Sequence, residues 1–217
     1  IEKFSFSTEA NSSNIATISS SHGYGSSQSS ETHGYVSGGD APLNKVIDKF
    51  VYATEANGTN IGNLTLDRWG PSGASSTTHG YASGGGRPGT PNLDTIDKFT
   101  FASDNDATDV GNLFQAIRYT GGISSTTHGY SSGGNYINTI QKWTFASDAN
   151  ATDNSDLTRA VGQVAGASST THGYTHGGNH GSSASNVIDK FPFASTANAT
   201  DVGDLTQSKL GMGEFHY

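Results

Sequence analysis

Four histidines recur in one short phrase and are the first residues of this chain that could do chemistry. Each stands in a His-Gly-Tyr triplet that follows Thr and precedes a pair of glycines. Several imidazoles around a common axis could hold a metal ion or an anion near one end of a central channel. The alternative is structural, because a repeat also copies residues that only bond to a neighbouring backbone. The ring would consist of His33, His79, His128 and His172, and His216 extends the series.

Turns rich in Asn and Asp offer oxygen ligands for a hard cation. In one turn, positions one, three, five and nine carry carboxylate, amide or hydroxyl oxygens, a spacing that resembles calcium loops. The glycine that such loops need at position six is replaced by Asp153. Asn and Asp also stabilise ordinary hairpin turns, so calcium is one of two interpretations and no other cofactor is expected. The calcium ligands would be Asp148, Asn150, Thr152 and Asp156.

Aromatic and basic residues gather in the connections that differ most from repeat to repeat. Sugar rings stack their C–H faces on aromatic side chains while their hydroxyls hydrogen-bond, so this mixture suits a carbohydrate ligand. For Trp69 and Tyr119 the alternative is burial between repeats. The candidate ligand-binding residues are Trp69, Tyr119, Arg68, Arg118, Arg87, Tyr136 and His176, with His180 beside them.

Composition and missing motifs narrow the function classes. A net charge of −8 with only 11 Lys and Arg argues against nucleic-acid binding. The absence of cysteine excludes disulfides and thiolate metal sites, and no apolar stretch approaches the roughly 18 residues of a membrane span. The chain has no nucleophile elbow, phosphate loop or HExxH motif, so we expect no enzyme. The rival is a hydrolase or lyase that uses Asp40, Asp67 and Asp94 of the variable loops.

A second phrase, of the type Ile-Asp-Lys-Phe, sets the elements that position these residues. It begins at 1, 47, 96, 140 and 188, so the period is 44 to 49 residues. Its aromatic residues alternate as in a strand, for example Phe99 and Phe101. Each unit is predicted to contain four strands: Ser-Ser-Thr-Thr, a tight turn at His-Gly, the Tyr-x-Ser-Gly-Gly strand, the aromatic strand, and a strand with Val-Gly-x-Leu. The recurring acids Asp48, Asp97 and Asp189 are predicted to make structural bonds to the next strand.

The glycine pair after the second strand resembles the kelch type of propeller blade. The family's fourth-strand Trp is absent, and the first strand is unusually rich in Ser and Thr. The resemblance implies an all-β fold in one domain, residues 1–217. We expect a five-bladed β-propeller of four-stranded antiparallel blades, closed where the N-terminal strands pair with the C-terminal segment. The glycine pairs are Gly38 and Gly39, Gly84 and Gly85, Gly133 and Gly134, and Gly177 and Gly178.

The nearly identical repeats rich in Ser, Thr, Asn and Gly are also similar to repeats in virion structural proteins of marine bacteriophages, such as tail or head fibres. This resemblance implies a non-enzymatic adhesion or assembly module at a virion surface or another extracellular place. Its partners would be glycans or protein surfaces, including other virion proteins, with neither nucleic acid nor membrane insertion.

Overall fold

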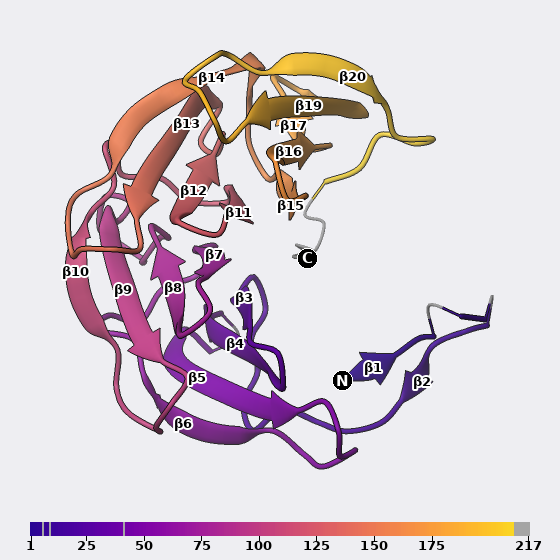
Figure 1. Ribbon diagram of the computed structural model, residues 1–217, viewed down its shortest axis with the longest axis vertical. Coiled ribbons are helices and arrows are strands. Elements are labelled where there is room, and N and C mark those ends of the chain that lie inside the picture. Colours follow the sequence, from indigo (N-terminus) through magenta and orange to yellow (C-terminus); the bar gives the residue numbers. More distant parts are fainter. Residues whose placement is uncertain (6, 9, 41, 211–217) are drawn as a thin grey trace.

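The computed structural model describes residues 1–217 except residues 6, 9, 41 and 211–217. The described residues form strands joined by turns and loops, with no helix among them. Four antiparallel sheets of four strands each stand around a common axis like propeller blades (Figure 1). The predicted all-β class and propeller arrangement are confirmed. In the described part of the chain, no helix has the length and apolar character to cross a bilayer.

Each blade is a meander whose four strands follow one another from the axis to the rim. The first blade consists of β3 (Ser26–Ser29), β4 (His33–Gly39), β5 (Asn44–Val51) and β6 (Thr59–Asn63). The second consists of β7 (Ser72–Ser75), β8 (His79–Ser83), β9 (Thr95–Thr100) and β10 (Thr108–Asn112). The third consists of β11 (Gly121–Ser124), β12 (His128–Ser132), β13 (Ile137–Thr144) and β14 (Thr152–Val161). The fourth consists of β15 (Ala165–Ser168), β16 (His172–His176), β19 (Val187–Pro192) and β20 (Thr200–Asp204), with β17 (Asn179–His180) and β18 (Ser183–Ala184) in a loop.

The hairpin between the first and second strands of a blade lies earlier in the sequence than predicted. In the second blade the turn is Ser76–Thr78, and β8 begins at His79. Ser76 Oγ accepts hydrogen bonds from the backbone N–H groups of Thr78 and His79 at 3.3 and 3.0 Å. Gly80 then lies opposite Phe99, whose ring occupies the space that a side chain would need. The predicted turn at His-Gly is therefore wrong, because this glycine makes room for an aromatic ring of the adjacent strand.

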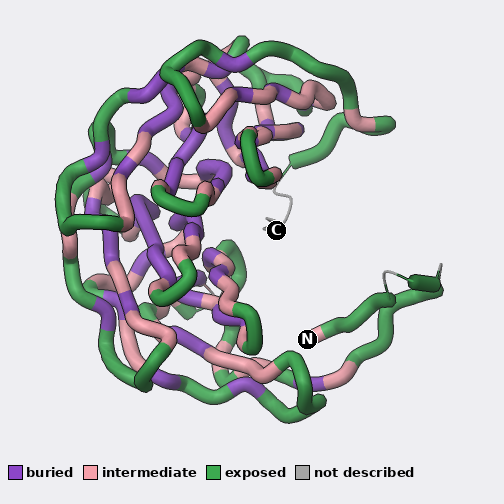
Figure 2. Tube along the Cα trace, in the orientation of Figure 1, coloured by how far each residue is buried: buried purple, intermediate pink, exposed green. Residues whose placement is uncertain are grey.

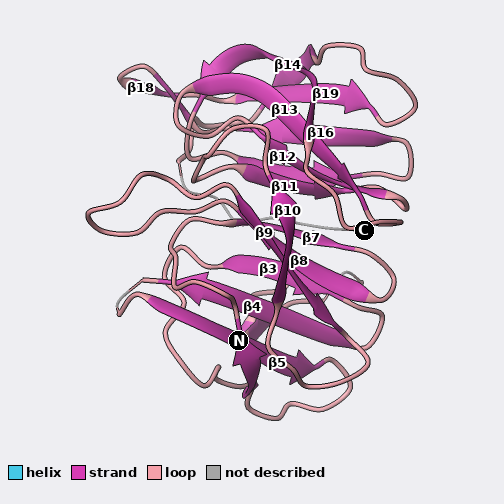
Figure 3. Ribbon diagram, turned by 90° about the vertical axis from the view of Figure 1, so that its left-hand side faces the viewer, coloured by secondary structure: helices cyan, strands magenta, loops and turns pink. Residues whose placement is uncertain are grey.

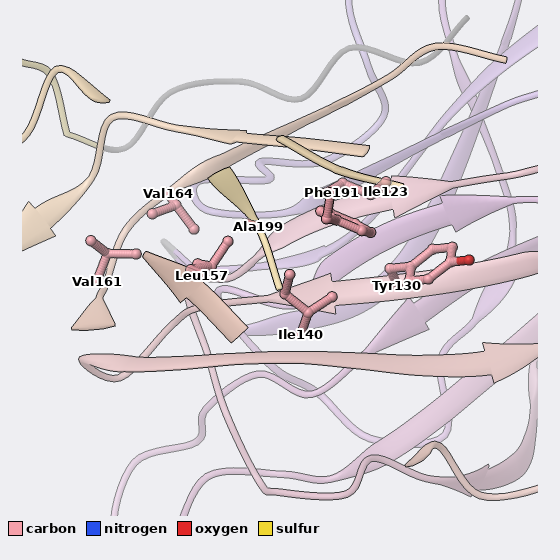
Figure 4. Packing of buried hydrophobic residues seen from close by; sticks show 8 residues of the cluster. All are labelled: Ile123, Tyr130, Ile140, Leu157, Val161, Val164, Phe191 and Ala199. Atoms are coloured by element: carbon pink, nitrogen blue, oxygen red, sulfur yellow. The ribbon is translucent and has the colours of Figure 1, made fainter. Parts of the chain in front are cut away.

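The hydrophobic core is divided among the boundaries between successive blades. At the boundary of the third and fourth blades, the Tyr130 ring lies 5.4 Å from Phe191 and 5.1 Å from Phe193. Leu157 and Ile140 of the third blade belong to the same cluster (Figure 4). Buried aromatic side chains contribute much of the energy of such a core. Each blade is thus packed against its neighbours through a shared hydrophobic cluster.

The N-terminal hairpin, formed by β1 (Glu2–Lys3) and β2 (Ser13–Asn14), corresponds to the third and fourth strands of a blade. Figures 1 and 2 place it at one end of an arc, with the exposed strand β20 at the other end. The described residues therefore form four complete blades, so the expected five four-stranded blades are not all present. The predicted closing strand and His216 lie outside the described residues.

Candidate functional site

The connection that enters each blade and the loop after its second strand lie on one face of the arc of blades. Isolated bridges join these two segments in three of the blades, in the pairs Gly23 and Asp40, Trp69 and Gly86, and Gly162 and Asn179. We call this side the loop face, and the opposite side, with the turns after the first strands, the turn face. Figure 3 shows the blades from the side, with connections at both ends of the strands. The prediction that the variable segments share one face is confirmed.

An aromatic cluster on the loop face brings together three connections that are far apart in the sequence. The guanidinium carbon of Arg118 lies 4.3 Å from the centroid of the Trp69 ring and 5.6 Å from that of Tyr119. The Trp69 and Tyr119 rings are 5.1 Å apart, and Tyr24 approaches Tyr119 edge-on at 5.5 Å. The site cluster, as we call Tyr24, Trp69, Arg118 and Tyr119, thus joins three of the predicted residues in a single group.

The two tyrosines of the site cluster have an unusual backbone. Tyr24 has φ 53° and Tyr119 has φ 58°, a left-handed conformation that costs an L-residue about 1–2 kcal/mol. Between them, the Gly70 amide donates to Tyr24 O at 2.7 Å, and the Tyr119 amide donates to Gly70 O at 2.8 Å. A side chain on Gly70 would collide with the Tyr119 ring. Strained residues held by their surroundings concentrate at functional sites.

Charged groups border the site cluster. Arg87 Nη2 lies 2.5 Å from Asp67 Oδ1. Burial raises the pKa of Tyr119, Arg118 lowers it, and Tyr24 and Asp40 raise it further, so the hydroxyl remains a proton donor at neutral pH. A shallow groove of about 420 Å³ lies beside Asp67 and includes Leu43 and Lys45 in its lining.

The remaining loop-face candidates lie apart from the site cluster. Tyr136 is exposed, has φ 59°, and its hydroxyl accepts a hydrogen bond from Asn179 Nδ2 at 2.8 Å. His180 Nδ1 is 2.8 Å from Ala160 O. His176 lies on β16, where burial lowers the pKa of its imidazole and Nδ1 has no hydrogen-bond partner. These residues are therefore not brought together with Trp69.

Arg68 was expected among the exposed ligand-binding residues, and this expectation is wrong. Its side chain is 0% exposed, and Nη2 lies 2.8 Å from Asp97 Oδ2. Burial lowers the pKa of Arg68 and the Asp97 carboxylate raises it. Asp97 also accepts from the amide and hydroxyl of Thr65 at 2.8 and 2.7 Å. Asp48 and Asp189 make the same type of contact, so the structural bond predicted for the recurring acid is confirmed. Its predicted partner, the next strand, is wrong, because Ser19, Thr65 and Thr158 all come before the blade that carries the acid.

The four repeat histidines each begin a second strand at the turn face. In His79, Nδ1 lies 2.8 Å from the hydroxyl of Thr78, and the imidazole ring is 6.5 Å from Tyr81. His33, His128 and His172 repeat the contact with the preceding threonine. No group of three or more His, Asp or Glu side chains in the described residues is arranged to hold a metal ion. The structure thus supports the structural alternative, in which each imidazole bonds to a residue beside it.

The predicted calcium ligands lie at blade boundaries. Asp148 forms an ion pair with Lys98 of the preceding blade, and Asn150 Oδ1 accepts from the Asn112 amide at 2.9 Å. The Asp156 amide donates to Asn198 at 3.0 Å, while Thr152 is an exposed residue of β14. Asp148 and Asn150 therefore already act as acceptors that join neighbouring blades.

Tyr24 completes the site cluster but was not among the candidates from the sequence. The position of Tyr24 in the repeat could have identified it, because Tyr24 follows Ile18 by the same six residues that separate Tyr119 from Leu113.

No protein-family model matches the chain, and no curated protein shows significant similarity to it. The site must therefore be interpreted from its own geometry.

Proposed function

We propose that this protein is a non-enzymatic binding module that holds a glycan at the site cluster. The observation that carries the proposal is the packing of Tyr24, Trp69, Arg118 and Tyr119 into one group on the loop face, where Tyr24 is exposed and the other three side chains are partly exposed. Aromatic faces stack on the C–H surface of a sugar ring, and the Tyr119 hydroxyl and Arg118 provide donors for its oxygens. Tyr24, which is 57% exposed, offers the most accessible ring.

The charge of the site favours an acidic sugar. Three of the four arginines have a carboxylate within ion-pair distance: Arg68 with Asp97, Arg87 with Asp67, and Arg159 with Asp201. Within the described residues Arg118 has no such partner, although two aromatic rings hold it in place. A guanidinium binds a carboxylate through charge-assisted hydrogen bonds. We therefore place the carboxylate of a uronic or similar sugar at Arg118.

The rival function, hydrolysis or lyase chemistry on the same face, has weaker support. Its candidates are Asp40, Asp67 and Asp94, and Asp67 is engaged with Arg87 at 2.5 Å. Acid and base catalysis on a glycosidic bond needs two carboxyl groups that flank that bond. Release of reducing sugar from a ligand that binds at the site cluster would favour this rival.

We also infer that the propeller has five blades and that the N-terminal hairpin is the outer half of the fifth. The hairpin contacts the first blade as complete blades contact one another: the Thr17 amide donates to Asn57 Oδ1 at 3.1 Å, and Lys3 pairs with Glu55 at 2.7 Å. With its kelch-type glycine pairs and its resemblance to virion repeats, the module suits adhesion at a virion surface or another extracellular place.

A glycan array that carries neutral and carboxylated sugars tests the proposed function. We expect binding by the wild-type protein and its loss in Trp69→Ala with Tyr119→Ala. The matched control is Tyr52→Ala, which removes an exposed ring at the turn face. Failure of the wild-type protein to bind any sugar would overturn the proposal, and stable complexes with virion proteins would then favour assembly.

A further inference from the structure

The recurring phrase builds the same interface at every boundary between two complete blades. Its tyrosine crosses to the next blade and packs on two aromatic residues, one near the end of the third strand and one directly after it. In one example the Tyr35 ring lies 5.5 Å from Phe99 and 4.7 Å from Phe101. The same arrangement joins Tyr81 to Trp143 and Phe145, and Tyr130 to Phe191 and Phe193.

A serine ladder links the first strands around the axis. The Ser29 amide donates to Ser75 Oγ at 2.9 Å, the Ser75 amide to Ser124 Oγ at 2.9 Å, and the Ser124 amide to Ser168 Oγ at 3.1 Å. A serine on one further first strand would accept from the Ser168 amide and donate to Ser29 Oγ. The described ladder therefore ends in a donor, the Ser168 amide, on one side and in an acceptor, Ser29 Oγ, on the other.

The first blade presents a receptor for a tyrosine that the described residues do not fill. Phe50 and Tyr52 occupy the positions of Phe99 and Phe101, and their rings are 5.8 Å apart. Tyr52 is 48% exposed. Beside them, β1 pairs only with β2 among the described strands, whereas the third strand of each complete blade pairs on both edges.

Among the described residues, the equivalent contacts are missing on the side of the fourth blade that faces away from the third blade. Ser132 Oγ of the third blade meets Thr175 Oγ1 of the fourth at 2.6 Å. His176 occupies the position of Ser132 in the next repeat, and its buried Nδ1 has no partner in the described structure. A polar group of an adjoining strand would satisfy it.

We propose that the space between the N-terminal hairpin and the fourth blade binds a β-hairpin that carries the recurring phrase itself. The second strand of this hairpin adds to the edge of β1 with which no other described strand pairs. By the register of β4 on β5, its His-Gly-Tyr places the glycine opposite Phe4 and the tyrosine opposite Lys3. The tyrosine ring then packs on Phe50 and Tyr52, and a first-strand serine joins the ladder.

A synthetic peptide with the sequence of residues 121–134, which contains one first strand, turn and second strand, tests the docking. When the peptide is added to the full chain at about 100 times the Kd of the complex, we expect the Tm of the protein to rise by about 5–10 °C. The peptide with Tyr130→Ser should give little or no shift. The protein variant Tyr52→Ser, which changes an exposed side chain, should fold and bind the original peptide more weakly.

Crosslinking checks the register, because the chain has no cysteine of its own. Glu2→Cys in the protein should form a disulfide with a peptide that carries Ser131→Cys, since these positions lie opposite each other in the proposed pairing. A peptide with Ser132→Cys should react much more slowly, because a shift of one residue turns the side chain to the other side. The proposal fails if millimolar peptide leaves Tm unchanged, if Tyr130→Ser has no effect, or if both cysteine peptides react equally.

Discussion

The two faces of the arc of blades are made by the same repeats, yet the turn face copies its contacts from blade to blade while the loop face changes its side chains. At the turn face, the distance from the Thr hydroxyl to His Nδ1 is 2.7 to 2.8 Å in all four blades. At the loop face, the equivalent positions hold Tyr24, Gly70, Tyr119 and Gln163. The backbone stays left-handed at all four positions while the side chains change.

This contrast separates the residues that maintain the propeller from those that we propose to bind a ligand. A residue copied in each blade makes the same bond each time, as Thr78 does with His79. At the loop face, Gly70 permits two tyrosines of different blades to meet, which no single repeat could arrange. Recurrence therefore indicates scaffold in this molecule, whereas residues that depart from the repeat include both the site cluster and a buried ion-pair partner, Arg68.

The largest expected effect is on the scaffold. Asp97→Ala leaves the buried Arg68 guanidinium without its carboxylate, so the free energy of unfolding should fall by about 3–5 kcal/mol in urea titrations. The double variant Asp97→Ala with Arg68→Met should recover part of this loss of stability. Trp69→Ala is the control from the loop face, and an equal loss in it would contradict the division between the two faces.

The next largest effect concerns the charge of the ligand. Arg118→Gln should weaken binding of a carboxylated sugar roughly 10- to 100-fold, as expected from the loss of a charge-assisted hydrogen bond. Binding of the matched neutral sugar should change little, and calorimetry can measure both. Arg87→Gln is the control, because Arg87 is already paired with Asp67. Equal weakening of both sugars by Arg118→Gln would mean that Arg118 supports the rings rather than reads the carboxylate.

Releasing backbone strain should separate stability from binding. Tyr24→Gly removes a left-handed tyrosine, so the free energy of unfolding should rise by about 1 kcal/mol. Sugar affinity should fall, because the most exposed ring of the site cluster is lost. Thermal denaturation and calorimetry on the same variant give both values. A variant that loses stability would show that the Tyr24 ring contributes more to packing than its backbone costs.

Much of the scaffold could be predicted from the sequence because it repeats. The alternation of aromatic residues predicted the third strand of each blade, and the recurrence of the acids predicted structural hydrogen bonds such as those of Asp97. Arg68 was misplaced because its side chain enters the core while Trp69, one residue later, faces the loops. A variable position can carry a structural ion pair, and the sequence does not distinguish such a residue from a ligand-binding one.

The site cluster was harder to predict for a physical reason. Tyr24 and Tyr119 are 95 positions apart in the sequence, and they meet because their connections bond through Gly70. The His-Gly turn was misassigned because a glycine beneath the Phe99 ring looks the same in sequence as a turn glycine. Both the site cluster and the position of the hairpin turn therefore depend on contacts between blades or strands, which local sequence patterns do not specify.

A smaller effect should come from pH at the turn face. Burial and Lys98 lower the pKa of His79 from 6.5, against a smaller opposite effect of Asp148, and burial and Lys142 lower the pKa of His128. Because the folded state favours the neutral rings, their contribution to stability is present above about pH 6.5 and is lost as pH falls through the folded pKa values. Urea titrations between pH 5 and 7 should show a smaller slope in the variant His79→Gln with His128→Gln. An unchanged slope would contradict this assignment.

The smallest expected effect tests whether the Asn-rich turns join blades or bind calcium. Asp148→Asn removes an exposed ion pair with Lys98, so the free energy of unfolding should fall by no more than about 1 kcal/mol. High salt should reduce this difference, since it screens an exposed pair. EDTA should leave Tm unchanged in both proteins, because Asn150 Oδ1 is already occupied by the Asn112 amide. A drop in wild-type Tm with EDTA that calcium restores, and that Asp148→Asn abolishes, would instead make the turn a metal site.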